Sequence, residues 1–407
     1  MATPEGQSFA LEGVRVLDFT WVHSGPAATR ILADQGAEVI KVESNFALAV
    51  VGGPSASTPR GMGQRHNWNA GKKSIALNMR HPDAVSIARR LVEVSDVVAE
   101  NFSARVMPGW GLDYGSLRLI KPDVVMLSMS GMGRTGPWKD YVTYGQTLQA
   151  WSGLTWLTGF PDTDPSGPAS AYSDAVAGIA GAQAVLLALM HRARTGEGQQ
   201  IDLAQFESLS VLLETLFLDL AVNGREVSRA GNRLPNSDAA PHGAYRCRGD
   251  DRWIAISVFT DAEWEAFVQA IGAPRWALDR KFSTASGRAR LADELDRLVE
   301  SWTIDRSPEE AMHLLQAAGV AAGVVQTGAD MLDLDPHLRE RGFFRQVPDD
   351  GGTPRTVERA PYRLSRTPGG PVRGAPEFGA HQTYVTRDLL GMSDEEAAQC
   401  AIDGVFE

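Results

Sequence analysis

Residues 14–42 read VRVLDFTWVHSGPAATRILADQGAEVIKV, and this stretch decides the fold. An apolar run at 14–19 is followed by small and apolar residues with helical spacing at 27–35, a glycine at 36 and a second apolar run at 37–42. Glycine often ends a helix because it adopts a left-handed backbone conformation without steric cost. The pattern predicts a strand, a helix and a second, parallel strand, which is the βαβ unit of α/β proteins.

Further segments of the same kind follow along the chain. Strands are predicted at 74–77, 97–99 and 124–129, with a helix at 82–94, and longer helices at 174–194 and 203–222. Parallel strands joined by helical crossovers assemble into an open sheet with helices on both faces. We therefore expect a large, doubly wound, Rossmann-like α/β domain.

The length of 407 residues exceeds the roughly 100 to 200 of an ordinary domain, so more than one domain is expected. Asn223-Gly224 is a plausible exit from the first domain, and residues 241–325 read as strands followed by helices, which is typical of a smaller α+β domain. Residues 353–374 are rich in Pro, Gly and Arg, as in a surface connection. We expect a large domain beginning with 1–224, a small α+β domain at 225–328, and a C-terminal segment at 329–407.

Composition excludes several classes of partner. The chain has 39 Lys+Arg against 50 Asp+Glu, a net charge of -11, which disfavours nucleic-acid binding and requires local positive charge if the ligand is polyanionic. Two cysteines, Cys247 and Cys400, provide neither a disulfide framework nor a metal site, and no histidine pair has metal-ligand spacing. The start of the chain lacks a signal-peptide pattern, and the apolar stretch 175–190 falls short of the roughly 18 to 20 residues of a membrane span. We expect a cytoplasmic protein without a membrane segment or bound metal.

Two glycine-containing motifs resemble nucleotide loops. Gly131, Gly133 and Gly136 spell G-x-G-x-x-G after a predicted strand, but Pro137-Trp138 follow where a dinucleotide site requires a helix, so we predict a glycine loop beside a ligand. The stretch GKKS at 71–74 lacks the first glycine of a phosphate-binding P-loop. Its two lysines are still candidate phosphate partners, and a solvated lysine pair is an equal alternative.

Asp174 is the candidate catalytic carboxylate. It opens a helix of small and apolar residues, which lets a ligand or another backbone approach closely. The alternative is an N-cap or first-turn acid that only stabilises the helix, by about 0.5 to 2 kcal/mol. Capping and catalysis are compatible, because an ionised, partly desolvated carboxylate is a nucleophile toward an activated acyl group.

A set of short strings occurs in the same order as in a known family. They lie at 11–19, 25–26, 32–43, 69–74, 96–102, 111–114, 194–199, 335–337 and 390–393. Together they resemble the family III CoA-transferases, which include formyl-CoA transferase and the carnitine and bile-acid CoA-transferases. The resemblance spans nearly the whole chain.

This resemblance implies a mechanism and a set of site residues. Asp174 matches the family's catalytic aspartate, which forms an aspartyl anhydride and then an aspartyl-CoA thioester. The implied substrate is a CoA thioester, and no permanently bound cofactor is implied. The backbone N–H groups of Gly131, Gly133 and Gly136 are the expected oxyanion donors. The implied CoA-binding residues are His23, Lys72, Lys73, Asn101, Phe102 and Tyr144, and Arg105 is added as a candidate by its proximity in sequence.

The resemblance also implies an assembly and a domain arrangement. Two chains are expected to interlock as a homodimer, each with a large domain built from both termini and a small domain from the middle. The C-terminal segment is thus expected to return to the large domain.

Departures from formyl-CoA transferase bear on the substrates. That enzyme has Gln where this chain has His23, Arg where it has Ser44 and Glu where it has Gly145, and its glycine-run loop in the small domain is absent. A carboxylic acid acceptor larger than formate or oxalate is therefore expected, with a dicarboxylate of the succinate type as a candidate. Four basic residues of the middle region could suit such a substrate: Arg233, His242, Arg246 and Arg248.

Two alternatives remain at this stage. The related α-methylacyl-CoA racemases use a histidine after the glycine loop, and residues 139–145 contain none. The chain could instead be a non-catalytic subunit of a hetero-oligomeric CoA-transferase, although the presence of Asp174 opposes this.

Overall fold

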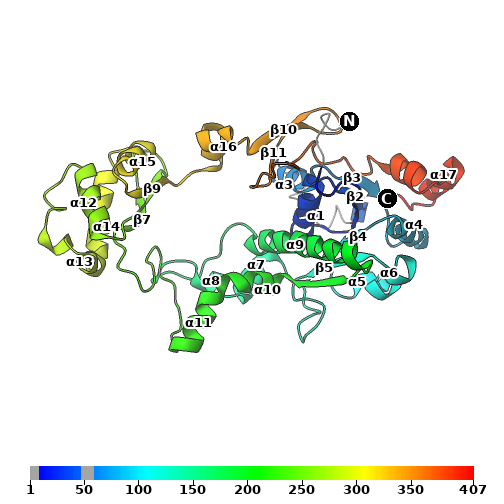
Figure 1. The fold of residues 1–407 in the computed structure, drawn as a ribbon, viewed down its shortest axis with the longest axis horizontal. Coiled ribbons are helices and arrows are strands. Elements are labelled where there is room, and N and C mark those ends of the chain that lie inside the picture. The colour runs from blue at the N-terminus through cyan, green and yellow to red at the C-terminus, as the bar shows by residue number, and fades with distance from the viewer. Residues whose placement is uncertain (1–8, 47–58) are drawn as a thin grey trace. The chain divides into compact units, whose positions relative to one another are not determined.

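The computed structural model describes residues 9–46 and 59–407 (Figure 1). Contacts divide the chain into two compact units, a large one within 1–155, 167–225 and 337–407, and a small one within 156–166 and 226–336. The expected boundaries put 156–166 in the large domain, whereas these residues make their contacts within the small unit.

The large unit is built on a six-stranded parallel sheet with the order β3-β2-β1-β4-β5-β6. Its strands are β1 (Arg15–Asp18), β2 (Glu38–Glu43), β3 (Lys73–Ala76), β4 (Val97–Glu100), β5 (Val125–Ser130) and β6 (Gln200–Ala204). The chain reverses its direction of winding between β1 and β4, which are neighbours. The expected doubly wound α/β fold is confirmed, and ligands bind such sheets where the winding reverses, at the carboxyl ends of the strands.

Helices cover both faces of this sheet. They are α1 (Ser24–Asp34), α3 (Pro59–Asn69), α4 (Pro82–Glu93), α5 (Val106–Gly109), α6 (Tyr114–Ile120), α7 (Gly145–Trp151), α8 (Leu154–Leu157), α9 (Tyr172–Thr195), α10 (Gln205–Ser210), the 3₁₀ turn η2 (Val211–Leu213) and α11 (Glu214–Asn223). One apolar core joins α4 and α6 to one face of the strands, and a second joins α1 and α9 to the other. Alternate strand residues serve the two cores, as the pleat requires.

Close packing of α1 and α9 depends on small residues. A Cβ atom at Gly178 would lie 2.8 Å from the Cβ of Ala27 and 3.1 Å from the carbonyl oxygen of Ser24. A Cβ at Gly181 would lie 2.9 Å from the sulfur of Met129. The glycines therefore bring the beginning of α9 against the beginning of α1. By length and composition α9 could cross a membrane, but one side of it is buried in this core.

The prediction of one continuous helix at 203–222 is wrong. Residues Gln200–Ala204 form β6, which pairs in parallel with β5, and helical structure begins only at Gln205. The backbone N–H and C=O groups of β6 form hydrogen bonds with the open edge of β5, and this pairing overrides the local preference for a helix.

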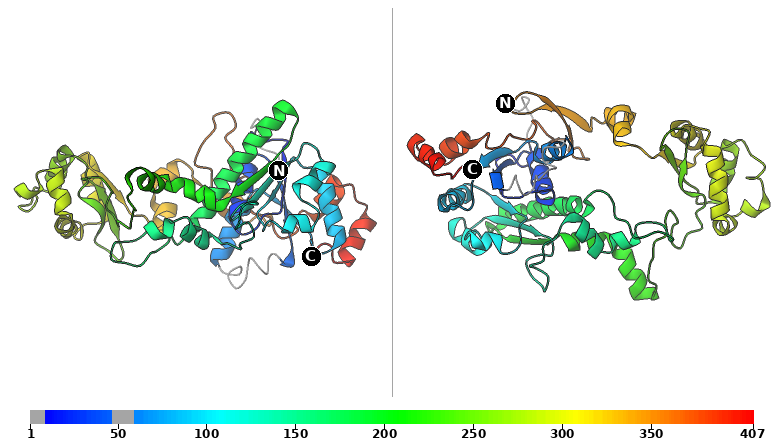
Figure 2. Two further views of the ribbon diagram at one scale, coloured as in Figure 1. Left: turned by 90° about the horizontal axis from the view of Figure 1, so that it is seen from below. Right: turned by 180° about the vertical axis from the view of Figure 1, so that it is seen from behind.

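The C-terminal segment packs onto the large unit (Figure 2). It contains α16 (Pro336–Glu340), a hairpin of β10 (Phe344–Pro348) and β11 (Pro354–Glu358), the π-helical turn η5 (Tyr384–Leu389) and α17 (Asp394–Ile402). Val385, Met392 and Val405 enter the core beside α4, and Arg90 of α4 forms an ion pair with Glu396, N···O 2.8 Å.

The small unit has its own core. Its antiparallel sheet consists of β7 (His242–Arg246), β8 (Trp253–Ser257) and β9 (Ala321–Val324), in that order. Around it lie α12 (Asp261–Ala270), the turn η3 (Arg280–Phe282), α13 (Ala285–Arg290), α14 (Ala292–Thr303), α15 (Pro308–Ala317) and the π-helical turn η4 (Asp330–Leu334). The expected α+β character is confirmed.

Candidate active site

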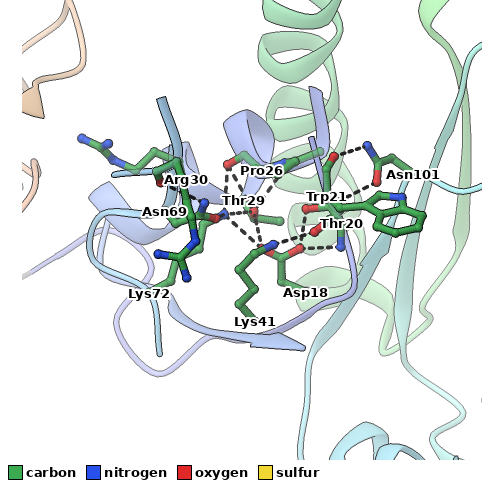
Figure 3. Close-up of polar contacts among 12 residues, drawn as sticks. Asp18, Thr20, Trp21, Pro26, Thr29, Arg30, Lys41, Asn69, Lys72 and Asn101 are labelled. Carbon is green, nitrogen blue, oxygen red and sulfur yellow. Dashed lines mark hydrogen bonds and ion pairs between the residues drawn. The ribbon is translucent and has the colours of Figure 1, made fainter. Parts of the chain in front are cut away.

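A buried polar network lies beneath the carboxyl end of β1 (Figure 3). The carboxylate of Asp18, the last residue of β1, accepts hydrogen bonds from the backbone N–H of Thr20 at 2.8 Å and from the Thr29 hydroxyl at 2.7 Å. The ammonium group of Lys72 lies 3.1 Å from the same carboxylate. Burial raises the pKa of Asp18, but Lys72, Lys41 and the threonine hydroxyls outweigh it and hold the pKa at about 2. The network joins the loop after β1 to the first turns of α1.

Lys72 does not take the predicted role of phosphate partner. Its side chain has 0% exposure, and its ammonium group also donates to the carbonyl oxygen of Pro26 at 3.1 Å and to the side-chain oxygen of Asn69 at 3.0 Å. Burial lowers the pKa of Lys72 to about 7, against the opposing effect of Asp18. All its donors already have acceptors within the protein, which corrects the sequence-based interpretation.

Lys73 is also engaged elsewhere. It forms an ion pair with Glu38, at the beginning of β2, and lies 3.7 Å from the ring centroid of Tyr384. Glu38 belongs to the amino end of the sheet, away from the edge where ligands bind. The predicted pair of phosphate-binding lysines is therefore divided between the interior and the opposite end of the sheet.

A cavity of about 770 Å³ opens over the carboxyl ends of β1, β2 and β3. Its walls are largely apolar and aromatic, with Trp21, Trp68 and Phe102 among them, and Glu377 and Phe378 of the C-terminal segment close it. A cavity of this size is typical of small-molecule sites.

The positive charge at this cavity comes from residues that sequence reasoning missed. Lys41, Arg65 and Arg80 line it. Lys41 donates to the carbonyl oxygen of Thr20 at 2.5 Å, Arg65 pairs with Glu43 at 3.1 Å, and the guanidinium of Arg80 lies 3.8 Å from the ring centroid of Phe46. Their only signal in the sequence was position, because Lys41 lies in a strand and Arg80 lies in the turn after another strand. Isolated basic residues carry no motif.

The other residues predicted to bind CoA are dispersed around this region. The ring of His23 stacks on Trp68 with centroids 3.9 Å apart, and burial lowers the pKa of His23 to about 4. Phe102 lies in the cavity wall. The side chain of Arg105 is exposed at the beginning of α5 and has no ion pair among the described residues, while Tyr144 is exposed at the beginning of α7.

Asn101 is occupied with the protein's own backbone. Its side-chain oxygen accepts the N–H of Trp21 at 2.9 Å, and its nitrogen donates to the carbonyl oxygen of Trp21 at 2.8 Å and to the Ser24 hydroxyl at 3.3 Å. It thus fastens the loop after β1 to the end of β4, as Figure 3 shows for Trp21.

Asp174 lies in the first turn of α9 and has 8% exposure. Ala171 precedes the helix as its N-cap residue, so Asp174 does not cap the helix but is an acidic residue of its first turn, the second form of the structural alternative. Burial raises the pKa of Asp174 to about 6, while the hydroxyl and the backbone N–H of Ser24 lower it by hydrogen bonding. Ser24 is the first residue of α1, so the carboxylate lies at the positive end of two helix dipoles.

Gly145 lies directly against this carboxylate. A Cβ atom at position 145 would be 2.4 Å from the Oδ2 atom of Asp174 and 2.6 Å from the Cβ of Ala171. The neighbouring Ser173 hydroxyl donates to the carbonyl oxygen of Gly145 at 3.1 Å. This bond holds the beginning of α7 beside Asp174. Position 145 has no room for a side chain.

The glycine loop after β5 lies against the segment that leads to Gly145. Gly133 and Gly136 have φ of +80° each, a conformation that favours glycine. A Cβ at Gly131 would lie 1.7 Å from the Thr143 hydroxyl, so the loop folds back on the segment that leads to Gly145.

The four basic residues of the middle region belong to the small unit and have partners there. Arg233 pairs with Asp293 at 2.8 Å and with Asp296 at 2.6 Å, and Arg248 pairs with Glu310 at 3.5 Å. The guanidinium of Arg246 lies 5.1 Å from the ring centroid of Trp253, and His242 contacts the carbonyl oxygen of Asn232 at 2.5 Å. Within the small unit they do not form an uncompensated anion site.

The doubly wound sheet, the cavity at its carboxyl edge and the buried carboxylate together define an α/β enzyme. The chain belongs to CoA-transferase family III, because the model of that family matches residues 11–382. It is 33% identical over 398 residues to succinyl-CoA–D-citramalate CoA-transferase of Chloroflexus aurantiacus, covering 95% of this chain and 96% of that protein.

Two further relatives agree with this assignment. The chain is 31% identical over 394 residues to the beta subunit of succinyl-CoA–L-malate CoA-transferase of the same organism, covering 95% of each. A crystal structure of a CAIB/BAIF family protein from Brucella suis superposes with a TM-score of 0.86 at 31% identity, covering 94% of this chain and all of that one. The resemblance seen in the sequence is therefore confirmed, and the two Chloroflexus relatives are named for acyl-CoA and carboxylate substrates.

Proposed function

We propose that this chain transfers CoA from succinyl-CoA or a similar acyl-CoA to a dicarboxylic acid, with Asp174 as the nucleophile. The observation that carries the proposal is the carboxylate of Asp174, which is nearly buried and has a pKa of about 6. A group with that pKa is largely ionised at neutral pH, and its desolvation makes it a better nucleophile.

The first half of the reaction forms the enzyme-bound thioester. A carboxylate oxygen of Asp174 attacks the carbonyl carbon of the donor thioester, and the C–S bond breaks to release CoA thiolate and leave a mixed anhydride. The thiolate then attacks the aspartyl carbonyl carbon and expels the donor carboxylate. Asp174 is left as a thioester of CoA.

The second half is the reverse with a new acid. The acceptor carboxylate attacks the aspartyl thioester and expels CoA thiolate, giving a second anhydride. The thiolate attacks the acceptor's carbonyl carbon, which releases the new acyl-CoA and restores the Asp174 carboxylate. Backbone N–H groups of Gly131, Gly133 and Gly136 are proposed to stabilise the oxyanions, and burial at 8% exposure keeps water from the anhydrides.

We propose that the nucleotide end of CoA binds in the 770 Å³ cavity. The aromatic walls suit the adenine ring, and the guanidinium groups of Arg65 and Arg80 suit the phosphates. His23, Phe102, Arg105 and Tyr144 remain proposed contacts. These cations provide the local positive charge that a protein of net charge -11 needs to hold a polyanion.

The dicarboxylate acceptor is supported by two observations. The relatives named for citramalate and malate act on dicarboxylic acids with succinyl-CoA. Position 145, where formyl-CoA transferase has glutamate, carries no side chain beside Asp174. Asp174 and Ala171 fill the place that a side chain at 145 would take, so the surroundings of the carboxylate differ from those in formyl-CoA transferase.

A homodimer is proposed as the assembly. Large apolar side chains are exposed on α9 and α11, and they are Ile179, Leu187, Met190, Phe217, Leu218 and Val222. Large apolar side chains exposed in number on two helices are typical of an interface with another chain. A second copy is the proposed partner, and a different subunit is the alternative, since the malate relative is named as a beta subunit.

Replacement of the nucleophile tests the proposal. Asp174→Ala is expected to abolish transfer from succinyl-CoA to malate, citramalate or glutarate, read by mass spectrometry of the acyl-CoA products. Wild-type protein incubated with succinyl-CoA and then hydroxylamine should yield a hydroxamate on the peptide that contains Asp174, and protein without succinyl-CoA is the control. Turnover by the alanine variant, or an unmodified peptide, would exclude the mechanism.

A further inference from the structure

The glycine loop of residues 131–136 depends on contacts outside itself for a fixed conformation. Gly133 and Gly136 both have φ of +80°, and glycine gives a free loop many backbone conformations. Backbone N–H groups stabilise an oxyanion well only when they are fixed in place before the reaction. The contacts that fix this loop are therefore candidates for a role in the transfer reaction.

Arg134, within this loop, is anchored on two sides. Its backbone N–H donates to a carboxylate oxygen of Asp202 in β6 at 2.9 Å. Its guanidinium group donates to a carboxylate oxygen of Glu100 at 2.8 Å and to the carbonyl oxygen of Ala104 at 2.9 Å. The planar guanidinium can serve both acceptors at once, which the single ammonium group of a lysine does less well. Arg134 thus joins β6 to the segment that begins at the end of β4.

That segment forms part of the cavity wall. Phe102 and Val106 line the cavity, and the backbone N–H of Phe102 donates to the second carboxylate oxygen of Glu100 at 2.8 Å. Glu100 therefore binds the cavity wall with one oxygen and the glycine loop, through Arg134, with the other. Glu100 is fully buried and Arg134 is largely buried, so water competes little for these bonds. Burial raises the pKa of the Glu100 carboxyl, and the charge of Arg134 is among the effects that lower it.

We propose that Arg134 and Glu100 are positioning residues, which hold the backbone N–H groups of the glycine loop at a fixed place relative to a CoA thioester bound in the cavity. The inference rests on the proposed roles of the cavity and of the glycine loop. Glu100 links the two, because the wall at Phe102 and the loop at Arg134 are bonded to one carboxylate. A purely structural ion pair would instead affect stability and leave turnover unchanged.

Replacement of the arginine tests this role by separating kcat from KM. Arg134→Met removes the guanidinium bonds and keeps the backbone bond to Asp202. The kcat for transfer from succinyl-CoA to malate should fall by on the order of tenfold or more, because the oxyanion donors are no longer fixed. KM for succinyl-CoA should stay within about twofold, because Glu100 still holds Phe102. Arg134→Lys can reach one of the two acceptors, so its kcat should lie between those of wild type and Arg134→Met.

A second variant and a control allow for a loss of stability. Glu100→Gln combined with Arg134→Met contains neither charge, and the glutamine oxygen can still accept the N–H of Phe102. This double variant should show the same loss of kcat as Arg134→Met. Arg192→Met is the matched control, because Arg192 is 17% exposed against 13% for Arg134 and pairs with Asp96 at 3.0 Å, at the opposite end of β4. It should keep the wild-type kcat.

Hydrogen exchange without substrate separates this inference from the proposed function. In folded Arg134→Met protein, a peptide covering 131–136 should exchange its amide hydrogens faster than in wild type, and in Arg192→Met at the wild-type rate. Unchanged exchange in Arg134→Met, or an equal loss of kcat in Arg134→Met and Arg192→Met, overturns the positioning role even if hydroxylamine traps Asp174. Faster exchange and a kcat loss confined to Arg134→Met, without a hydroxylamine adduct in wild type, uphold the positioning role and reject Asp174 as the nucleophile.

Discussion

Asp174 is held between opposing influences. Burial favours its protonated form and Ser24 favours its ionised form, and the pKa of about 6 is the balance. A carboxylate that is ionised but poorly solvated is stabilised less by its surroundings than it would be in water, so it gains when it forms a covalent bond.

The same balance predicts a pH-dependent stability. Below about pH 3 the Asp174 carboxyl is protonated in both the folded and the unfolded chain and contributes nothing. As pH rises toward 6 the unfolded chain ionises first, because its pKa is near 3.8, so the folded state loses stability. Above pH 6 the full cost is about 3 kcal/mol. Asp174→Asn should therefore be more stable than wild type by about that amount at pH 8, and about equal to it at about pH 3.

Urea unfolding at the two pH values checks this prediction. Asp18→Asn is an instructive control, because the pKa of Asp18 is lowered to about 2, so its ionised form stabilises the folded protein. That variant should be less stable than wild type at pH 8. Equal stability of Asp174→Asn and wild type across the range would mean that the carboxylate is not desolvated.

Gly145 offers a second residue-scale prediction. An alanine there would place its Cβ 2.4 Å from an oxygen of Asp174, so the carboxylate must turn away from its position. Gly145→Ala should lower kcat by at least about tenfold, since small displacements of a reacting group carry large rate penalties. Gly109→Ala is the control, because nothing lies within 4 Å of a Cβ at 109. An equal loss of kcat in Gly145→Ala and Gly109→Ala, or no loss in either variant, would contradict this geometry.

At the scale of elements, the adjacent residues Lys72 and Lys73, at the beginning of β3, have different roles. Lys72 is buried against Asp18, while the side chain of Lys73 is 24% exposed beside Glu38. Lys72→Met leaves a buried carboxylate without its partner and should destabilise the protein by about 3 to 5 kcal/mol. Lys73→Met loses a partly exposed pair and should cost about 1 kcal/mol or less.

Thermal and chemical unfolding of these two variants give the comparison. Folded Lys72→Met protein that retains wild-type stability, but binds CoA more weakly by calorimetry, would restore the phosphate-binding interpretation of Lys72. We expect the opposite: Lys72→Met lowers the stability of the protein, and folded Lys73→Met protein binds CoA with wild-type affinity.

The elements show where sequence reasoning succeeds and where it stops. The strands and helices of 14–42 were predictable because apolar runs, glycine and helical spacing are local signals. β6 was not, because its strand conformation comes from pairing with β5, some 70 residues earlier. For the same reason Lys72 could be identified as an unusual lysine, but its burial against Asp18 depends on β1 and β3 entering one sheet.

At the scale of the whole molecule, family membership and α/β architecture follow from ordered strings spread over the chain. The cavity could not be predicted from these strings, since Arg65, Arg80 and the C-terminal Phe378 come together only in the folded chain. The position of Asp174 was predictable, and its contacts with Ser24 and Gly145 required the packing of three helices.

The exposed apolar side chains of α9 and α11 predict the oligomeric state. Light scattering should give twice the mass of the 43.9 kDa chain, and Leu187→Glu combined with Phe217→Glu should give the single-chain mass, because buried charges disrupt an apolar interface. Ile402→Glu changes an equally exposed apolar residue on α17 and is the control. A wild-type protein of single-chain mass would reject the homodimer.

The wall of the cavity joins residues 19–110 to Glu377 and Phe378, near opposite ends of the chain. During synthesis the ribosome makes the first βαβ units long before these two residues, and the small unit is translated in between. The growing chain therefore lacks a complete cavity until the last few dozen residues emerge. The proposed CoA site is thus complete only when translation is almost finished, so CoA bound there would stabilise the finished fold and not the nascent chain.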